Sequence, residues 1–216
     1  MKIGVTQRVE LNQEVGEVRD ALDQNWTRLL ELAGCVVTPI PNALNQVDAW
    51  LSSQNLDGFL LSGGNDLSHL PGARTASHAR DTTEASILKW AMEYKLPVIG
   101  ICRGMQMINC YLGGKLSKIE GHVKRDHEVY CVKGGFIVDV DQQVNSYHDY
   151  SIEENDLASS LIPQVYAWDG SIEAFRHAYL PWVGVMWHPE RAPEPRIAAE
   201  AARMCEMFQK LQEKTE

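Results

Sequence analysis

A cysteine between two glycines has the residue types and spacing of a catalytic nucleophile. Residues 100–104 read Gly-Ile-Cys-Arg-Gly, a spacing typical of the nucleophile elbow, where a tight strand-to-helix turn lifts the nucleophile to the edge of a sheet. A side chain two positions from the nucleophile would collide in that turn, so glycine is expected at both places. Backbone N–H groups at the helix start favour the thiolate of Cys102 and can bind an oxyanion. The alternative is a buried cysteine with glycines for ordinary packing.

A histidine and a glutamate two positions apart could complete this chemistry. His188 and Glu190, separated by a proline, follow an apolar run at 182–187. A cysteine nucleophile needs a base, and the base needs a group that orients it. The carboxylate can face the same side as the imidazole, accept its second N–H and select its tautomer. Alone, this tripeptide is better explained as a surface turn; together with the elbow, it predicts a triad with Cys102.

Acyl transfer also needs hydrogen-bond donors for the oxyanion. The N–H group of Arg103, directly after the cysteine, is one such donor. Another is expected from a second loop at a strand end, and Gly63-Gly64, after the apolar run at 58–62, meets this requirement. A plain turn before a helix cap would explain the same dipeptide.

Short apolar runs alternate with helical patterns in the first half of the chain. Strands are predicted near 3–6, 35–40, 58–62 and 97–101, and helices near 18–33, 47–51, 80–95 and 105–112, with a polar loop at 7–8. This rhythm favours right-handed crossovers and a doubly wound parallel sheet. Ligands of such sheets bind at the carboxyl ends of the strands, where Cys102 and His188 are both expected.

The second half has the pattern of antiparallel hairpins. One is predicted from 128–132 and 136–140, and another from 164–168 and 171–176 with Asp169-Gly170 as a type I′ turn. A last strand at 182–187 and a helix at 197–211 follow. Because no linker-like composition separates the halves, we expect a single domain spanning 1–216, α/β in class, with an antiparallel extension.

Composition and charge exclude several classes of function. The 216 residues are 44% hydrophobic and 23% charged, as in ordinary globular proteins. A net charge of −9 without a basic stripe argues against nucleic acid as a partner. No apolar window is long enough to cross a membrane. Five cysteines without regular spacing predict reduced thiols and a cytoplasmic location.

Three residues invite a metal-site interpretation. His122, His127 and Cys131 lie near one another in the chain, but their spacing matches no structural zinc site. An ordinary loop-and-strand location explains them better, so no metal is predicted. His148 is expected to support the backbone before it, and Glu173 to structure a hairpin near the site.

Five motifs in a fixed order resemble those of a known family. They are Leu-Ser-Gly-Gly-Asn-Asp at 61–66, Gly-Ile-Cys-Arg-Gly-Met-Gln at 100–106, Val-Asn-Ser-Tyr-His at 144–148, Asp-Gly-Ser-Ile-Glu-Ala at 169–174 and Gly-Val-Met-Trp-His-Pro-Glu at 184–190. The set is similar to that of the γ-glutamyl-γ-aminobutyrate hydrolase branch of the class I glutamine amidotransferases. The resemblance runs from Ile3 to about Arg191. It implies a three-layer, flavodoxin-like fold with a mostly parallel sheet.

The resemblance also implies a site and a reaction. Cys102 would be the nucleophile, His188 the base and Glu190 the acid that orients it. The remaining implied site residues are Gly64 and Arg103 for the oxyanion, and Gly63, Gln106, Asn145, Ser146 and Tyr147 for the substrate. Gln106 would help to hold the γ-glutamyl group, and the backbone of 145–147 its α-carboxylate. A γ-glutamyl amide would be hydrolysed through a thioester to release glutamate, without a cofactor.

Within that branch, three stretches look most like the γ-glutamyl-CDP-amidate hydrolases: 4–8, 120–123 and 188–191. Those enzymes release cytidine diphosphoramidate for the phosphoramidate groups of surface glycans. A nucleotide leaving group needs cationic donors. We expect Arg8 to be one, with Arg103, Arg74 and Lys124 as alternatives.

Other functions stay open at this point. One is hydrolysis of γ-glutamyl-GABA or similar γ-glutamyl amines. Another is a glutaminase subunit that supplies ammonia to a separate synthase, although Arg103 stands where glutaminases often carry a small residue or leucine. The predicted partner is a small γ-glutamyl substrate, and both a monomer and a homodimer are compatible with the sequence.

Overall fold

A nine-stranded sheet, with strand order β4-β1-β5-β6-β13-β12-β11-β8-β9, runs through the molecule. The computed structural model describes residues 1–133, 135–137, 140 and 143–213. The strands of the sheet are β1 (Lys2–Thr6), β4 (Val36–Ile40), β5 (Gly58–Leu61), β6 (Val98–Ile101), β8 (Val123–Cys131), β9 (Gln143–Tyr147), β11 (Leu161–Ala167), β12 (Ile172–His177) and β13 (Trp182–Val185). Apart from these, β2 (Arg8–Asn12) pairs with β3 (Glu17–Ala21), and β7 (Ser117–Lys118) with β10 (Tyr150–Ser151).

Five neighbouring strands of this sheet are parallel. β1 pairs with β4 and β5, β5 with β6, and β6 with β13, all in parallel register. Counted along the chain, these five strands have the order 2-1-3-4-5, which is that of flavodoxin-like sheets. The apolar runs that predicted them are buried along their whole length in β5, β6 and β13, as strands covered on both faces require. The predicted α/β fold class is confirmed.

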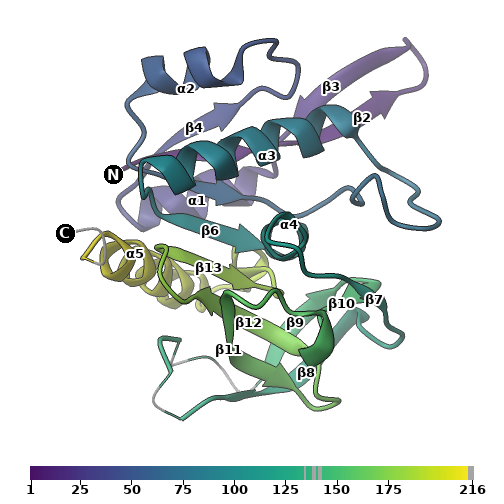
Figure 1. Ribbon diagram of the computed structural model, residues 1–216, viewed down its shortest axis with the longest axis vertical. Coiled ribbons are helices and arrows are strands. Elements are labelled where there is room, and N and C mark those ends of the chain that lie inside the picture. Colours follow the sequence, from purple (N-terminus) through teal and green to yellow (C-terminus); the bar gives the residue numbers. More distant parts are fainter. Residues whose placement is uncertain (134, 138–139, 141–142, 214–216) are drawn as a thin grey trace.

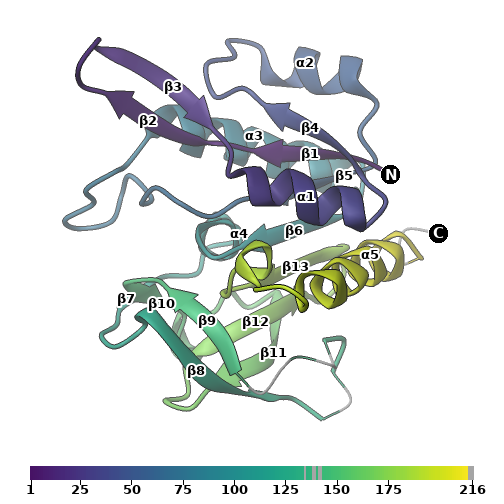
Figure 2. The ribbon, with the colours of Figure 1, turned by 180° about the vertical axis from the view of Figure 1, so that it is seen from behind.

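Helices cover both faces of the parallel half. α3 (His78–Glu93) and α4 (Arg103–Tyr111) lie in front of the sheet in Figure 1, with α2 (Val47–Gln54) packed against α3. α1 (Gln24–Leu32) and α5 (Ile197–Glu213) contact each other on the opposite face, which Figure 2 shows from behind. Each buries an apolar side, for example Trp26 and Leu29 in α1. The result is the three-layer arrangement that the resemblance implied.

The longest helix, α5, is amphipathic. It spans 17 residues and buries Ala201, Met204, Phe208 and Leu211 on one side, while its polar residues face outward. In the part of the chain that is described, we find no helix with both the length and the apolar character that crossing a bilayer requires.

The antiparallel half extends the sheet beyond β13. β12 pairs antiparallel with both β13 and β11, and β11 with β8, so the hairpin predicted at 164–176 is confirmed. Its turn differs from the prediction. The N–H of Gly170 donates to the Ala167 carbonyl at 3.0 Å, and Gly170, not Asp169, has a positive φ of 90°. This is a three-residue loop ending in glycine, because a type I′ turn needs positive φ at both central residues.

Short 3₁₀ turns occur at Glu154–Asp156 and Pro189–Arg191.

The helix predicted at 18–33 is wrong in its first part, and so is the polar loop at 7–8. A β-hairpin of β2 and β3 turns at Gly16, whose φ is 68°. Val18 sits on this hairpin with 70% of its surface exposed, so its helical spacing to Trp26 was coincidental. The helix begins only after Asp23, whose side chain accepts a hydrogen bond from the Asn25 N–H as an N-cap does.

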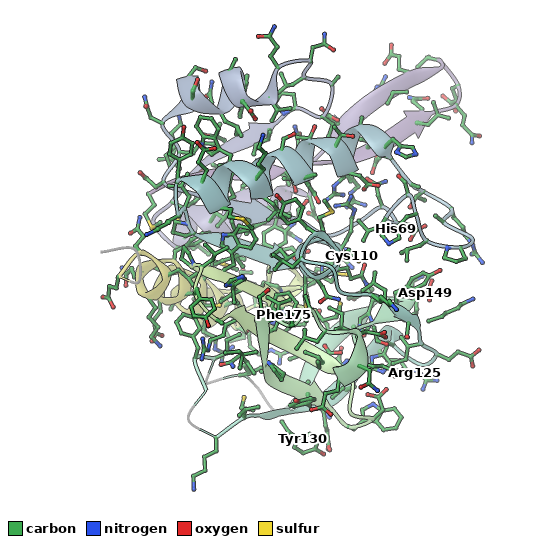
Figure 3. The ribbon with its side chains drawn as sticks, viewed as in Figure 1. His69, Cys110, Arg125, Tyr130, Asp149 and Phe175 are labelled. Carbon is green, nitrogen blue, oxygen red and sulfur yellow. The ribbon has the colours of Figure 1, made fainter. Side chains whose placement is uncertain are left out.

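The hairpin predicted from 128–132 and 136–140 is also wrong where it is described. β8 pairs with β9 on one side and β11 on the other, and residues 136, 137 and 140 form no strand. Residues 138 and 139 of that prediction lie outside the described part of the chain. Tyr130 of β8 points away from the body of the molecule, whereas Phe175 of β12 lies inside it (Figure 3).

Candidate active site

Three adjacent strands of the parallel sheet end at the same edge, and each is followed by a candidate site segment. Gly63-Gly64 follows β5, Cys102 follows β6 directly, and His188 follows β13. Because β5 and β13 are the two neighbours of β6, these segments converge on Cys102. The structure thus brings together the groups that the sequence placed at separate strand ends.

The turn at Cys102 is strained in the way the glycine spacing predicted. Cys102 is the N-cap of α4 and has φ 51° and ψ −105°, an uncommon conformation for a residue with a side chain. A Cβ on Gly100 would lie 2.6 Å from the Gly104 carbonyl, and one on Gly104 would lie 2.1 Å from the Leu61 oxygen. Both glycines are required because the backbone crosses itself and β5 at these points. Such strain persists where the surroundings hold it, commonly at functional sites.

The buried His188 is held from both sides. Its Nδ1 lies 2.7 Å from Oε1 of Glu190, which the 3₁₀ turn after Pro189 carries back toward the ring. Its backbone is fixed by the Asn145 amide, which donates to the His188 carbonyl and accepts from the His188 N–H, both at 2.8 Å. The ring of Tyr147 meets the imidazole edge-on at 5.6 Å. The bond to Glu190 directs the Nδ1 proton toward the carboxylate and leaves Nε2 for the thiol.

The thiol and the imidazole shift each other's pKa in opposite directions. Burial alone would raise the pKa of Cys102, but the charge of His188, a hydrogen bond to it and the Arg103 N–H lower it. Burial likewise opposes charge on His188, yet Cys102 and Glu190 together raise the pKa of His188 to about 9. The lowered pKa of Cys102 and the raised pKa of His188 both favour the thiolate–imidazolium form of the pair, the reactive form of a nucleophilic cysteine.

A buried arginine hydrogen-bonds to the loop that contains Gly63 and Gly64. Arg80 of α3 donates to the Ser62 carbonyl at 2.6 Å, the Gly63 carbonyl at 3.1 Å and the Gly64 carbonyl at 2.5 Å. Arg80 thus holds the carbonyls of this loop on one side. Gly63 also packs against His188, because a Cβ there would lie 2.6 Å from Cε1 of the imidazole.

The side chain of Arg103 is held by two carboxylates. Its guanidinium is buried and paired with Glu84 and Asp81 of α3, and Glu84 also receives Arg80 Nε at 2.9 Å. One ion-pair network therefore joins the loop at 62–64 to the residue after Cys102. These ion pairs engage the side chain of Arg103, which also lines the hollow at Cys102. Its role as the cation for a leaving group, an alternative from the sequence, stays a prediction.

A hollow of about 330 Å³ opens onto Cys102. Its lining includes Gly64, Gln106, Tyr147 and His148, together with the cations Lys124 and Arg191. A second hollow of about 310 Å³ adjoins it and shares Tyr147, His188 and Arg191. The guanidinium of Arg191 lies 4.3 Å over the Tyr147 ring, at the boundary between the two.

Comparison with known proteins places this arrangement in a family. The profile described as peptidase C26 matches residues 2–190. The chain belongs to the peptidase C26 family. A γ-glutamyl-CDP-amidate hydrolase of Campylobacter jejuni is 36% identical over 192 residues, which are 88% of this C26 chain and 90% of that protein. The carbamoyl phosphate synthase small chain of Staphylococcus haemolyticus is 32% identical over 177 residues, 80% of this chain and 43% of that one.

Solved structures agree on the fold of this C26 protein. The structure of a glutamine amidotransferase of Thermotoga maritima matches this chain with a TM-score of 0.65 and 14% sequence identity. The match covers 100% of this chain and 96% of that one. The likeness shows the flavodoxin-like fold of class I glutamine amidotransferases. The family membership and the relative of 36% identity support an activity of the glutamine amidotransferase and hydrolase type.

The other predicted substrate residues of the C26 chain lie at or behind the hollow. Gln106 lines it, and its amide donates to the Tyr150 carbonyl at 3.0 Å. Ser146 is fully buried and donates to the His122 carbonyl at 2.5 Å, so its side chain is structural. Arg8 packs over Gly64 and lines a small adjoining hollow with His188 and Glu190, not the one onto which Cys102 opens.

The sequence reasoning did not consider Arg191 as a cation of the site. Arg191 belongs to the stretch 188–191 that supported the resemblance, but its place over Tyr147 comes from the packing of two segments 44 residues apart in the chain. Arg74, another cation considered for the leaving group, is not among the residues that line either hollow.

We expect Glu84→Gln to destabilise the protein by about 3–5 kcal/mol, because two buried guanidinium groups lose their shared carboxylate. Urea unfolding monitored by circular dichroism measures this. The neighbouring charges of Arg103 and Arg80 outweigh burial and lower the pKa of Glu84. Its contribution is therefore present at neutral pH and lost as pH falls through the lowered pKa. Glu93→Gln, at the exposed end of α3, is the control; a loss no larger than this control's would contradict the network.

Proposed function

We propose that this protein hydrolyses γ-glutamyl amides, with Cys102 as nucleophile, His188 as proton carrier and Glu190 as its orienting carboxylate. The observation that carries the proposal is the buried His188–Glu190 bond of 2.7 Å beside a strained, thiolate-favouring Cys102. Relatives in the same family include a γ-glutamyl amidate hydrolase.

The first step forms a thioester. The Cys102 thiolate attacks the γ-carbonyl carbon, and the carbonyl electrons move onto oxygen. The backbone N–H groups of Gly64 and Arg103 hold this oxyanion, each worth about 10²–10³ in rate. As the oxyanion collapses, the C–N bond breaks and the leaving nitrogen takes the proton from the His188 imidazolium.

The second step hydrolyses the thioester. His188, now neutral and still oriented by Glu190, takes a proton from water as the water attacks the same carbon. A second tetrahedral oxyanion forms at the same N–H groups. Its collapse breaks the C–S bond, releases glutamate and restores the thiolate–imidazolium pair.

Recognition of the glutamyl half uses the edge of the antiparallel extension. Among the described strands, β9 stands at the end of the sheet, so one side of its backbone is available to a ligand. The backbone of Asn145, Ser146 and Tyr147 holds the α-carboxylate there, and Gln106 contacts the γ-glutamyl chain from α4. Residue 63 must be glycine for His188 to keep its place, since a Cβ there would strike the ring.

We propose a nucleotide phosphoramidate, γ-glutamyl-CDP-amidate, as the substrate. The relative from Campylobacter jejuni carries this activity in its name and matches nearly the whole chain. Lys124 and Arg191 bring two cations to the hollow at Cys102, and the second hollow continues it past Arg191. A diphosphate leaving group would use both cations, whereas a neutral amine would use neither. Arg8 is the third candidate for this contact.

The test compares substrates. Purified protein should hydrolyse γ-glutamyl-CDP-amidate with a kcat/KM at least 10-fold above those for γ-glutamyl-GABA and glutamine. Lys124→Ala should raise KM for the nucleotide substrate about 10-fold, the worth of one charge-assisted contact, and leave γ-glutamyl-GABA unaffected. Lys89→Ala, exposed on α3, is the control. A preference for γ-glutamyl-GABA or glutamine would overturn the nucleotide assignment. It would leave the proposed role of Cys102, His188 and Glu190 in catalysis unaffected.

A glutaminase role is the second candidate. The small chain of carbamoyl phosphate synthase is 32% identical, although this chain covers only 43% of it. The same assay decides between the two, because a glutaminase subunit would release ammonia from glutamine faster than glutamate from the nucleotide substrate.

A further inference from the structure

Four buried side chains converge on one point behind the proposed substrate site. His122 precedes β8, His127 lies on β8, His148 follows β9 and Glu173 lies on β12. One ligand atom of each lies within 4.8 Å of all the others. Their exposed fractions are 0%, 7%, 3% and 1%, so water has almost no access to them. None of them belongs to the proposed triad.

Each histidine already uses one ring nitrogen on an acceptor. His122 Nε2 lies 2.8 Å from the Asp169 carboxylate, His127 Nδ1 lies 3.3 Å from the Glu128 carbonyl, and His148 Nδ1 lies 3.0 Å from the Tyr150 carbonyl. Carboxylate and carbonyl oxygens only accept, so these three nitrogens carry the protons. In a neutral imidazole the other nitrogen then presents a lone pair.

The inward atoms have no hydrogen-bond partner among the described residues. They are His122 Nδ1, His127 Nε2, His148 Nε2 and both oxygens of Glu173. Oε1 of Glu173 lies 3.8, 3.6 and 3.4 Å from the three nitrogens, in the order of the chain. These separations exceed good hydrogen-bond lengths. Three lone pairs and a carboxylate facing one another without a positive charge would be costly to bury.

We propose that these four residues bind one Zn²⁺ ion. Zinc bonds of 2.0–2.1 Å in tetrahedral geometry place neighbouring ligand atoms roughly 3.3 Å apart. The distances of 3.4–3.8 Å therefore suit an ion at the centre better than direct contact. Imidazole nitrogens with one carboxylate are a donor set that zinc accepts. The outer bonds to Asp169 and the two carbonyls are the second shell that metal-bound histidines have.

The site is structural. Four protein ligands complete a tetrahedral shell and leave no coordination position for water or substrate, although His148 also lines the hollow at Cys102. The ion would tie β8 and β12 to the turn between β9 and β10. His148 directly follows Tyr147, so the ion would hold the end of the strand that lines the hollow. The proposal reverses the expectation of no metal and leaves out Cys131, which is exposed and outside the cluster.

The test is metal content and affinity of the full chain. Protein purified from zinc-supplemented medium should contain one equivalent of zinc, and protein stripped with a chelator should take up one Co²⁺ with the visible absorption of a tetrahedral site. His127→Gln should lose stoichiometric binding. Asp169→Asn should weaken zinc affinity about 10–100-fold, as expected for a second-shell partner. His78→Gln, on an exposed histidine of α3, is the control and should bind normally.

Two outcomes would overturn the proposal. One is folded, stripped wild-type protein that binds neither Zn²⁺ nor Co²⁺. The other is binding that survives His127→Gln with unchanged affinity, which would place the ion elsewhere. Neither outcome depends on hydrolysis, so failure here leaves the proposed reaction untouched.

Discussion

Replacing Cys102 with alanine is expected to lower γ-glutamyl amide hydrolysis by about 10⁴-fold or more. The thiolate is the atom that attacks the carbonyl, and no other cysteine can take its place. Cys110 lies on the same helix, but burial raises its pKa to about 11, so it stays a thiol at neutral pH. Steady-state assays of glutamate release measure the effect, and circular dichroism checks that the variant is folded.

The control for this change is Cys110→Ala. It removes a sulfur from α4 at a partly buried position outside the hollow and should retain the activity of the unmodified protein. Turnover by Cys102→Ala within a few fold of the unmodified protein would eliminate the thioester mechanism, since water would then attack without a covalent intermediate.

Glu190→Gln is expected to lower kcat by about 10²–10⁴-fold, by analogy with the effect of removing the carboxylate of a triad. The carboxylate selects the Nδ1–H tautomer of His188 and supports its positive charge. Without it, the raised pKa of His188 falls toward its ordinary value, and the lowered pKa of Cys102 rises. The fraction of Cys102 present as thiolate at neutral pH therefore falls.

Alkylation of Cys102 by iodoacetamide separates this effect from misfolding. In the unmodified protein the rate should rise less between pH 7 and 8 than that of a cysteine with an ordinary pKa, because the pKa of Cys102 is lowered. In Glu190→Gln the rate at pH 7 should fall and then rise with pH. Glu194→Gln changes an exposed carboxylate in the same segment and should leave the rate unchanged. An unaltered pH profile in Glu190→Gln would show that Glu190 does not act through His188.

The parallel half of the fold was predictable because its signals are local. Uninterrupted apolar runs such as that of β6 bury both faces of a strand, and glycines at 100 and 104 have one geometric explanation, the crossing backbone at Cys102. The proximity of His188 to Cys102 was also predictable, because parallel strands of one sheet end at the same edge.

The parts that sequence reasoning missed depend on contacts between distant segments. The β2–β3 hairpin carries apolar residues at helical spacing by chance, and only pairing across Gly16 makes it a sheet. Arg103 looked available to a substrate because its partners, Glu84 and Asp81, are on another helix. The cluster of His122, His127, His148 and Glu173 has no motif spacing, because its members come from β8, the residue before it, the residue after β9, and β12.

The most direct test of the proposed mechanism is covalent labelling with a glutamine analogue in which a diazomethyl ketone replaces the amide. Cys102 should be alkylated by one equivalent, located by mass spectrometry of peptides, and activity should fall in proportion to labelling. A γ-glutamyl substrate should protect the protein, and Cys102→Ala should not react. Labelling of another residue, or activity that survives complete labelling of Cys102, would contradict a reaction that passes through this cysteine.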